Sequence, residues 1–161
     1  LVHAPVASGK YGNSTPMFGF ERQGAPVTSF VRLSNEKIRA KNQVYNPDCT
    51  LILDPSLLIS APVFEGMKED SVAVLNTQVS DAQSLITSPN IKRVAWLDAT
   101  TIALEMLGRP ITNTIMLGAF VKATGWVDKV ELEKVVLKFF GEKNVETFRR
   151  GYNDVKLFDF S

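Results

Sequence analysis

The sequence predicts an α/β domain with a mostly parallel β-sheet. Short apolar runs that end in polar residues alternate with segments whose apolar residues recur at helical spacing, and helical patterns fill the last part of the chain. Short apolar runs with polar C-terminal ends are typical of strands in a sheet that is covered on both faces. Strands separated by short helices, followed by a run of helices, indicate parallel pairing of the strands.

Four apolar segments are predicted to be strands. The second of them is a continuous apolar run that Asp54 and Pro55 close. The last residues, Leu157–Ser161, are expected to form either a docking strand or a loose end. In chain order, the four predicted strands are Val27–Ser34, Thr50–Pro55, Ser71–Thr77 and Lys92–Thr100.

Helical patterns occupy the gaps between the strands and the C-terminal part of the chain. Gly108 and Gly125 each follow a helical pattern, and glycine is the residue that most often ends a helix. Asp128 lies three residues before Glu131, which is a capping-box-like start for the next helix. The predicted helices are Asp81–Thr87, Thr100–Leu107, Asn113–Ala123, Glu131–Phe140 and Lys143–Val155.

Length and composition indicate one domain over residues 1–161 and exclude several classes of site. A formal net charge of +1 gives no electrostatic reason to expect nucleic acid or a membrane surface as a partner. The single cysteine, Cys49, and the single histidine, His3, exclude a cysteine-ligated cluster, a zinc site and a Ser-His-Asp triad within this chain. No apolar run reaches the ~20 residues that span a bilayer, and the first residues do not form a signal peptide, so we expect a cytoplasmic protein.

A polar loop precedes the first predicted strand and is the first candidate for function. Its residues Glu21, Arg22, Gln23 and Gly24 combine an acid, a base and an amide beside a glycine. The planar fork of Arg22 suits a phosphate, a carboxylate or the acidic side chain of a partner. Alternatively, the loop contains only a local ion pair and a glycine that its turn requires.

Polar residues at the C-terminal ends of strands are the second group of candidates. Ligands gather at this edge of an open parallel sheet, but short polar residues there also cap the helices and turns that follow. Asn113 and Thr114 open a predicted helix, where free N–H groups attract anions and where N-capping is an equally good explanation. The strand-end residues are Asp54, Asn76, Thr77 and Asp98.

Other distinctive residues have simpler interpretations. Cys49 is expected to be an inert core thiol, Trp96 to pack inside the sheet and Trp126 to pack at a helix junction. Met17, Phe18 and Phe20 either form an interface patch or anchor the polar loop in the core.

The order of several motifs resembles the gamma subunit of the 2-oxoacid:acceptor oxidoreductases. This family includes pyruvate, 2-oxoisovalerate, 2-oxoglutarate and arylglyoxylate oxidoreductases, and the resemblance covers about Gly9 to Val155. The strongest motifs are F-G-x-E-R-x-G-A-P-V (Phe18–Val27) and G-R-P-I-x-N-T-x-M-L-G-A (Gly108–Ala119), and QVYNPDCTLILDP, VLNT and EKNVETFRRGY occur in the same order.

The resemblance implies a three-layer, Rossmann-like domain within a heteromeric complex of anaerobic metabolism, such as pyruvate synthase. Such complexes oxidatively decarboxylate a 2-oxoacid on thiamine diphosphate with Mg²⁺, and pass electrons through [4Fe–4S] clusters to ferredoxin or NAD. The acyl group usually ends on coenzyme A. Thiamine-binding alpha and beta subunits and a ferredoxin-like delta subunit hold the cofactors. The gamma subunit is then structural, lies on the coenzyme A side and is not catalytic alone. Its expected contacts with coenzyme A or a partner are Glu21, Arg22, Gln23, Gly24, Asn113 and Thr114.

This sequence departs from the family pattern at its start. Family members begin with a strand and a glycine-rich loop of the GRGGQG kind, and the sequence here begins after that position. Leu1–Ser8 resembles the remnant of a helix that would follow such a strand, although Pro5 counts against a helix. We expect an incomplete start rather than a divergent form, because losing a central strand would expose unpaired strand edges.

Two other functions fit the same pattern of elements. One is an independent Rossmann-type dinucleotide-binding oxidoreductase, which would normally carry a glycine fingerprint that this sequence lacks. The other is an α/β interaction module without a link to redox chemistry.

Overall fold

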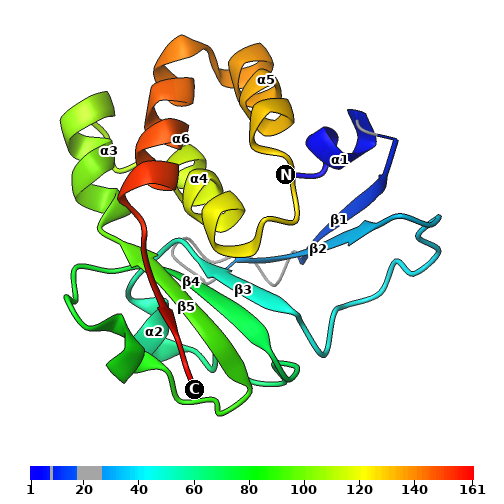
Figure 1. Ribbon diagram of the computed structural model, residues 1–161, viewed down its shortest axis with the longest axis vertical. Helices are drawn as coiled ribbons and strands as arrows, with labels where there is room; N and C mark the ends of the chain where they lie inside the picture. Colours follow the sequence, from blue (N-terminus) through cyan, green and yellow to red (C-terminus); the bar gives the residue numbers. More distant parts are fainter. Residues whose placement is uncertain (8, 18–26) are drawn as a thin grey trace.

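The computed structural model describes residues 1–7, 9–17 and 27–161 and contains a central four-stranded sheet (Figure 1). The strand order is β3-β4-β5-β6, with β3, β4 and β5 parallel and β6 antiparallel to β5. The predicted α/β fold with a mostly parallel sheet is therefore confirmed. The strands are β3 (Cys49–Ile52), β4 (Ser71–Asn76), β5 (Ile91–Leu97) and β6 (Lys156–Asp159).

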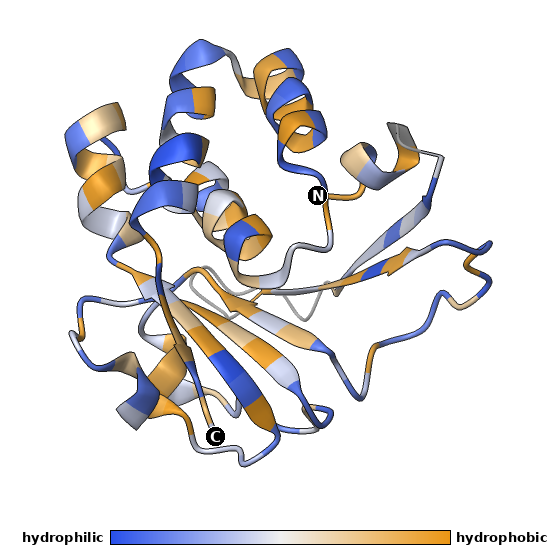
Figure 2. Cartoon of the chain, viewed as in Figure 1, coloured by the Kyte–Doolittle hydropathy of each residue, from blue (hydrophilic) through white to orange (hydrophobic). Residues whose placement is uncertain are grey.

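Helices cover both faces of this sheet and make three layers. On one face, Val72 and Val74 of β4 pack against the longer helices, and on the other face Leu75 packs against the segment around Phe64 and Ala82. All six residues of β4 are buried, as expected of a strand between two layers. Figure 2 shows the three parallel strands as largely hydrophobic. The longer helices are α3 (Ala99–Leu107), α4 (Asn113–Thr124), α5 (Lys129–Phe140) and α6 (Glu142–Asp154), and the opposite layer contains α2 (Leu57–Ser60) and the 3₁₀ helix η1 (Ala82–Leu85).

The predicted helix boundaries follow local capping chemistry. Gly108 and Gly125 end α3 and α4 in the left-handed region, with φ of 67° and 64°, which glycine adopts without a steric penalty. Asp128 caps α5, because its Oδ1 accepts a hydrogen bond from the backbone N–H of Glu131 at 2.9 Å. The helix predicted over Asp81–Thr87 is instead the short 3₁₀ helix η1.

The first predicted strand is present but lies outside the central sheet. It forms β2 (Thr28–Ser34), which pairs with β1 (Tyr11–Met17) in an antiparallel two-stranded ribbon. No residue of β2 is buried, so the expectation of a buried strand at this position was wrong. The strand β1 was not predicted, because its residues are mostly polar and include Pro16.

The two ends of the described chain lie against the rest of the fold. The short helix α1 (His3–Ala7) forms despite Pro5, and the buried Ala4 contributes to the cluster that includes Leu132 and Phe148. The C-terminal segment docks as β6 on β5, with Arg93 opposite Asp159, which confirms a docking strand rather than a loose end. Among the helices of the described residues, none combines the length and the apolar character needed to cross a membrane.

Candidate functional site

Asn76, at the C-terminal end of β4, joins three elements of the fold. Its side chain is 1% exposed, and its Nδ2 donates to the carbonyl oxygen of Leu53 at 2.8 Å and to Thr100 Oγ1 at 2.9 Å. Its Oδ1 accepts from the backbone N–H of Ala99 at 3.0 Å. Because its donors and its acceptor are already paired within the chain, Asn76 holds the strand ends and α3 together rather than a ligand.

The other strand-end residues also pair locally. Both carboxylate oxygens of Asp98 accept hydrogen bonds from Thr101, from its N–H at 2.9 Å and from its hydroxyl at 2.6 Å. Thr77 is buried, and its Oγ1 accepts from the N–H of Val79 at 3.2 Å. Asp54 accepts from the N–H of Ser56 at 2.9 Å, and this hydrogen bond lowers the pKa of its carboxyl. The capping interpretation therefore accounts for these residues.

A hollow of about 370 Å³ lies at this edge of the sheet, between β5, α3, α6 and β6. Asp98, Glu105 and Asp154 bring carboxylates to it, and Arg150 and Lys156 bring cations. Arg150 Nε donates to Asp154 Oδ2 at 2.8 Å, so these two charges are already paired. The mixture of charges gives the hollow no clear preference for an anionic ligand.

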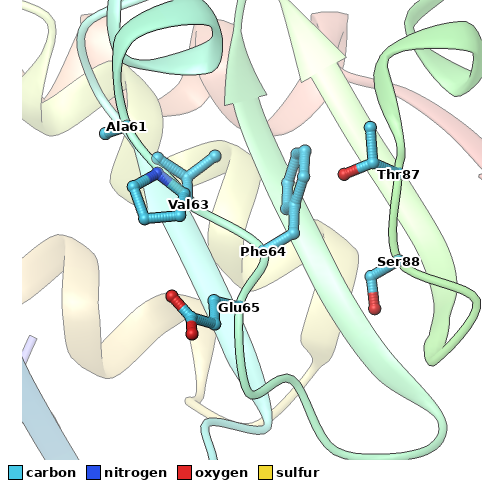
Figure 3. A pocket seen from close by; sticks show the side chains of 7 residues that line it. Ala61, Val63, Phe64, Glu65, Thr87 and Ser88 are labelled. Atoms are coloured by element: carbon cyan, nitrogen blue, oxygen red, sulfur yellow. The ribbon is translucent and has the colours of Figure 1, made fainter.

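A second hollow, of about 290 Å³, lies beside α2, on the face of the sheet that α2 and η1 cover (Figure 3). Figure 3 shows Phe64 between Val63 on one side and Thr87 and Ser88 on the other. Glu65 is the one charged residue among the seven that line this hollow, and no base or cation accompanies it there. Its lining therefore contains no set of residues for acid–base or nucleophilic catalysis.

The predicted polar loop, Glu21 to Gly24, lies outside the described residues. In the sequence it falls between β1 and β2. The contact role predicted for Glu21, Arg22, Gln23 and Gly24 stays a prediction.

The two other predicted contact residues, Asn113 and Thr114 at the start of α4, differ in their exposure to solvent. Asn113 is exposed, whereas Thr114 is 3% exposed and its hydroxyl lies 2.7 Å from Thr147 Oγ1 and 3.2 Å from Asn144 Oδ1 of α6. Arg109, in the turn before α4, is also exposed and was missed as a candidate, although it belongs to the motif over Gly108–Ala119. Asn113 thus remains available for an external contact, while the Thr114 side chain joins two helices.

The donor set of the described residues does not fit an iron–sulfur cluster or another metal site. Cys49 is half-buried and packs against the core, and burial, with a smaller contribution from the charge of Asp48, raises the pKa of its thiol to about 12. The inertness expected of this thiol stays a prediction. Within the described ranges, no three His, Cys, Asp or Glu side chains come together in a way that could hold a metal ion. A [4Fe–4S] cluster requires several thiolates, and this chain has one cysteine.

A comparison with protein families gives a match over nearly the whole chain. Residues 1–153 match the family model described as pyruvate ferredoxin/flavodoxin oxidoreductase. The matched region includes the central sheet strands β3 to β5 and almost all of α6.

Individual proteins agree with this match. The chain is 44% identical to the "Pyruvate/ketoisovalerate oxidoreductases common subunit gamma" of Pyrococcus furiosus, over 99% of this chain and 89% of that protein. It is also 44% identical to the "NADH-dependent phenylglyoxylate dehydrogenase subunit gamma" of Aromatoleum evansii, over 98% of this chain and 85% of that protein.

A solved structure has the same fold. The crystal structure of the pyruvate oxidoreductase subunit PORC of Thermotoga maritima superposes with a TM-score of 0.82 at 35% identity. The alignment covers 97% of this chain and 86% of that one.

Proposed function

Because this chain belongs to the pyruvate ferredoxin/flavodoxin oxidoreductase family, as a gamma subunit of the 2-oxoacid:ferredoxin oxidoreductases, we propose that it is the coenzyme A-side subunit of a thiamine-dependent complex. In this complex a 2-oxoacid is oxidatively decarboxylated, its acyl group passes to coenzyme A and its electrons pass to ferredoxin or NAD. The observation that carries the proposal is the family match over residues 1–153. We place the complex in the cytoplasm.

The proposal assigns the cofactors to other subunits. Thiamine diphosphate and Mg²⁺ belong to alpha and beta subunits, and the [4Fe–4S] clusters belong to a ferredoxin-like delta subunit. The protonated Cys49 thiol and the scattered carboxylates of the described residues support this division, because they do not form a ligand set. The chemistry of the reaction is that of the cofactors, and this chain contributes binding and positioning.

Substrate choice is also assigned to other subunits. The Pyrococcus furiosus relative is named as a subunit common to pyruvate and ketoisovalerate oxidoreductases. One gamma subunit that serves two oxidoreductases supports the view that the residues which distinguish the 2-oxoacids lie outside this subunit.

The proposed contacts with coenzyme A or a partner are Glu21, Arg22, Gln23, Gly24, Asn113 and Thr114. Exposed Asn113 at the N-terminus of α4, with exposed Arg109 in the preceding turn, supports an anionic group at that position. The buried hydroxyl of Thr114 leaves its backbone N–H as the group that it would contribute.

Native purification tests the proposed function. We expect this chain to copurify with larger subunits, in a brown complex that absorbs visible light through its iron–sulfur clusters and releases thiamine diphosphate when denatured. Isolation of the chain from its native source as a stable, colourless monomer would refute the proposal. Saturable binding of NAD or NADP by the lone chain would instead favour an independent dinucleotide-binding oxidoreductase.

The Arg22→Ala variant tests the proposed contact. We expect it to raise the KM for coenzyme A or to weaken assembly by about tenfold, as the loss of a charged hydrogen bond of ~1.5 kcal/mol or more would do, while thiamine diphosphate stays bound. Lys143→Ala, which removes an exposed charge from α6, is the matched control. Unchanged assembly together with unchanged coenzyme A kinetics in Arg22→Ala would contradict the assignment.

A further inference from the structure

Buried hydrogen bonds tie the first turn of α4 to the start of α6. Thr114 is 3% exposed and Thr147 is 0% exposed, and their hydroxyl oxygens lie 2.7 Å apart. Thr114 also donates to Asn144 Oδ1 at 3.2 Å, and Asn144 Nδ2 donates to the carbonyl oxygen of Phe140, the last residue of α5, at 2.9 Å. We call Thr114, Asn144 and Thr147 the polar link, because they join α4 to the point where α5 ends and α6 begins.

The polar link depends on the Thr147 hydroxyl. Each hydroxyl has one proton, and Thr147 can also donate within α6, to the carbonyl oxygen of Asn144 at 2.9 Å. When Thr147 donates there, Thr114 donates to Thr147; when Thr114 donates to Asn144 Oδ1, Thr147 donates to Thr114. Without the Thr147 hydroxyl, only the longer contact, at 3.2 Å between Thr114 and Asn144, remains of the tie between α4 and α6 in the polar link.

Two glycines bring the backbones of α4 and α6 into contact farther along both helices. A Cβ at Gly151 of α6 would clash with the backbone of Ile115, and a Cβ at Gly118 of α4 would clash with that of Phe148. In both helices the polar link lies on the N-terminal side of these residues. The glycines therefore set the distance between the helices, and the polar link adds a separate tie at the first turn of α4.

Another side of the same turn faces solvent. Asn113 is exposed although it adjoins Thr114, because successive residues of a helix point about 100° apart. Arg109, in the turn before α4, is exposed as well. Thr112 occupies the N-cap position, but its side chain makes no capping hydrogen bond to α4, whereas aspartates cap α3 and α5. The turn that the polar link anchors therefore presents an amide and a nearby cation to solvent.

We propose that Thr147 and Asn144 are positioning residues for coenzyme A, because through Thr114 they hold the first turn of α4 where Asn113 meets the cosubstrate. The inference rests on the proposed function, which places a coenzyme A contact at this turn. Thr147 is fully buried and does not touch coenzyme A itself, so it acts only through the position of the turn. Hydrogen bonds weaken steeply when their distance or angle changes, so a small displacement of the turn loosens the contact.

The Thr147→Val variant tests the proposal in the complex assembled from all of its subunits. Valine keeps the shape of threonine but cannot make the hydroxyl contact with Thr114. We expect the Kd for coenzyme A, measured by isothermal titration without a 2-oxoacid, and the KM for coenzyme A both to rise about threefold to tenfold. The kcat at saturating coenzyme A and the KM for the 2-oxoacid should stay within about twofold of wild type. Turnover is measured with pyruvate, 2-oxoisovalerate or phenylglyoxylate, whichever the complex oxidises.

Two matched variants distinguish positioning from general damage to the fold. Thr147→Ser keeps the hydroxyl and should restore the wild-type Kd and KM. Thr124→Val removes a hydroxyl from the other end of α4, where Thr124 Oγ1 donates to the carbonyl oxygen of Phe120 at 2.9 Å, and should leave both values unchanged. If the Thr147→Val complex does not assemble, Asn144→Ala, at a half-buried position, replaces it with the same expected results.

A double variant tests whether Thr114 transmits the effect. Thr114→Val keeps its backbone N–H but removes the same hydroxyl contact from the other side. Combined with Thr147→Val, it should raise the Kd for coenzyme A by no more than about twofold beyond Thr147→Val alone, because both substitutions remove one shared contact. Single effects that multiply in the double variant would show that the two residues act independently, and would overturn the proposal.

The results separate this inference from the proposed function. If the wild-type complex neither binds coenzyme A nor transfers an acyl group to it, the proposed function falls and the inference falls with it. If the wild-type complex uses coenzyme A but Thr147→Val leaves the Kd and the KM unchanged, the inference alone is overturned. It is also overturned if Thr124→Val raises the Kd as much as Thr147→Val does, because a general loosening of α4 would then explain the effect.

Discussion

At the residue scale, the polar side chains at the sheet edge illustrate why residue type and position alone do not identify a binding site. Asn76 lies where ligands bind in many parallel sheets, yet its amide is fully engaged with Leu53, Thr100 and Ala99. An amide that already pairs with three backbone or hydroxyl groups would leave them unpaired if it turned toward a ligand. The cost of such unpaired groups keeps Asn76 in a structural role.

Cys49 provides the first prediction at this scale. Cys49 is only partly buried as a residue, but the surroundings of its thiol and the nearby Asp48 raise its pKa to about 12, so the thiolate that reacts with alkylating agents is scarce near pH 8. We expect iodoacetamide to modify Cys49 at least about tenfold more slowly in the folded chain than in urea. Mass spectrometry of samples quenched over time measures both rates. Equal rates in the two states would show that the thiol is accessible and ionisable in the fold.

At the scale of elements, the packing of α4 on α6 depends on two glycines that allow the helix backbones to touch. A Cβ at Gly118 would lie 2.0 Å from the carbonyl oxygen of Phe148, and a Cβ at Gly151 would lie 1.8 Å from that of Ile115. Both obstacles are backbone atoms, which cannot move without separating the helices. This close approach also allows the Thr114 and Thr147 hydroxyls to meet at 2.7 Å.

Alanine substitutions at these glycines should therefore destabilise the fold. Gly→Ala within an exposed helix normally stabilises it by about 1 kcal/mol, but overpacking here should lower the free energy of unfolding by about 3 kcal/mol or more. Gly108→Ala is the control: its Cβ would meet nothing within 4 Å, and only its positive φ would cost about 1 kcal/mol. Urea denaturation of Gly118→Ala, Gly151→Ala and Gly108→Ala measures the three values. Neutral or stabilising effects at Gly118 and Gly151 would contradict the close contact.

At the scale of the whole molecule, ion pairs between elements make stability depend on pH. Glu133 of α5 accepts from Arg149 Nη2 of α6 at 2.9 Å, and this hydrogen bond lowers the pKa of the Glu133 carboxyl below its ordinary 4.5. Asp159 of β6 accepts from Arg93 Nη2 of β5 at 2.8 Å, which lowers the pKa of Asp159 below its ordinary 3.8. Both carboxylates stay ionised in the folded chain at pH values where the unfolded chain takes up protons.

This difference predicts a loss of stability in acid. A carboxyl whose pKa is lower in the folded chain than in the unfolded chain stabilises the fold at pH values above its ordinary pKa. This stabilisation disappears as pH falls through the lowered pKa of the folded chain. We expect Glu133→Gln and Asp159→Asn to be less stable than wild type at about pH 7 and to approach wild-type stability as pH falls through the lowered pKa values, with small effects because both pairs are partly exposed. Urea midpoints across this range test the prediction, with Glu69→Gln as the exposed, unpaired control. A difference that persists at the lowest pH would show that packing, and not charge, is responsible.

Apolar runs and helix-ending residues were sufficient to predict much of the fold. The strands β4 and β5 are mostly apolar, and Gly108, Gly125 and Asp128 mark helix ends by chemistry that acts within a few residues. Trp96 lies in β5 and Trp126 lies between α4 and α5, as predicted. These features were predictable because local preferences and burial agree in them.

The β1–β2 ribbon and the candidate contacts could not be predicted in the same way. The apolar residues of β2 suggested a buried strand, but its partner β1 is polar and the ribbon they form has no buried residue. Asn113 and Thr114 are adjacent and similar in polarity, yet one is exposed and the other is joined to α6. Such differences arise from contacts between residues far apart in the chain, which no local pattern records.

The sequence by itself determined the α/β class, most helix ends and the membership of a gamma-subunit family, because periodicity, capping and long collinear motifs are properties of neighbouring residues. Only the tertiary structure decided which polar groups are satisfied inside the fold and which side chains remain exposed. The physical reason is that burial and hydrogen-bond pairing depend on distant segments meeting in space, so they exist only once the chain has folded.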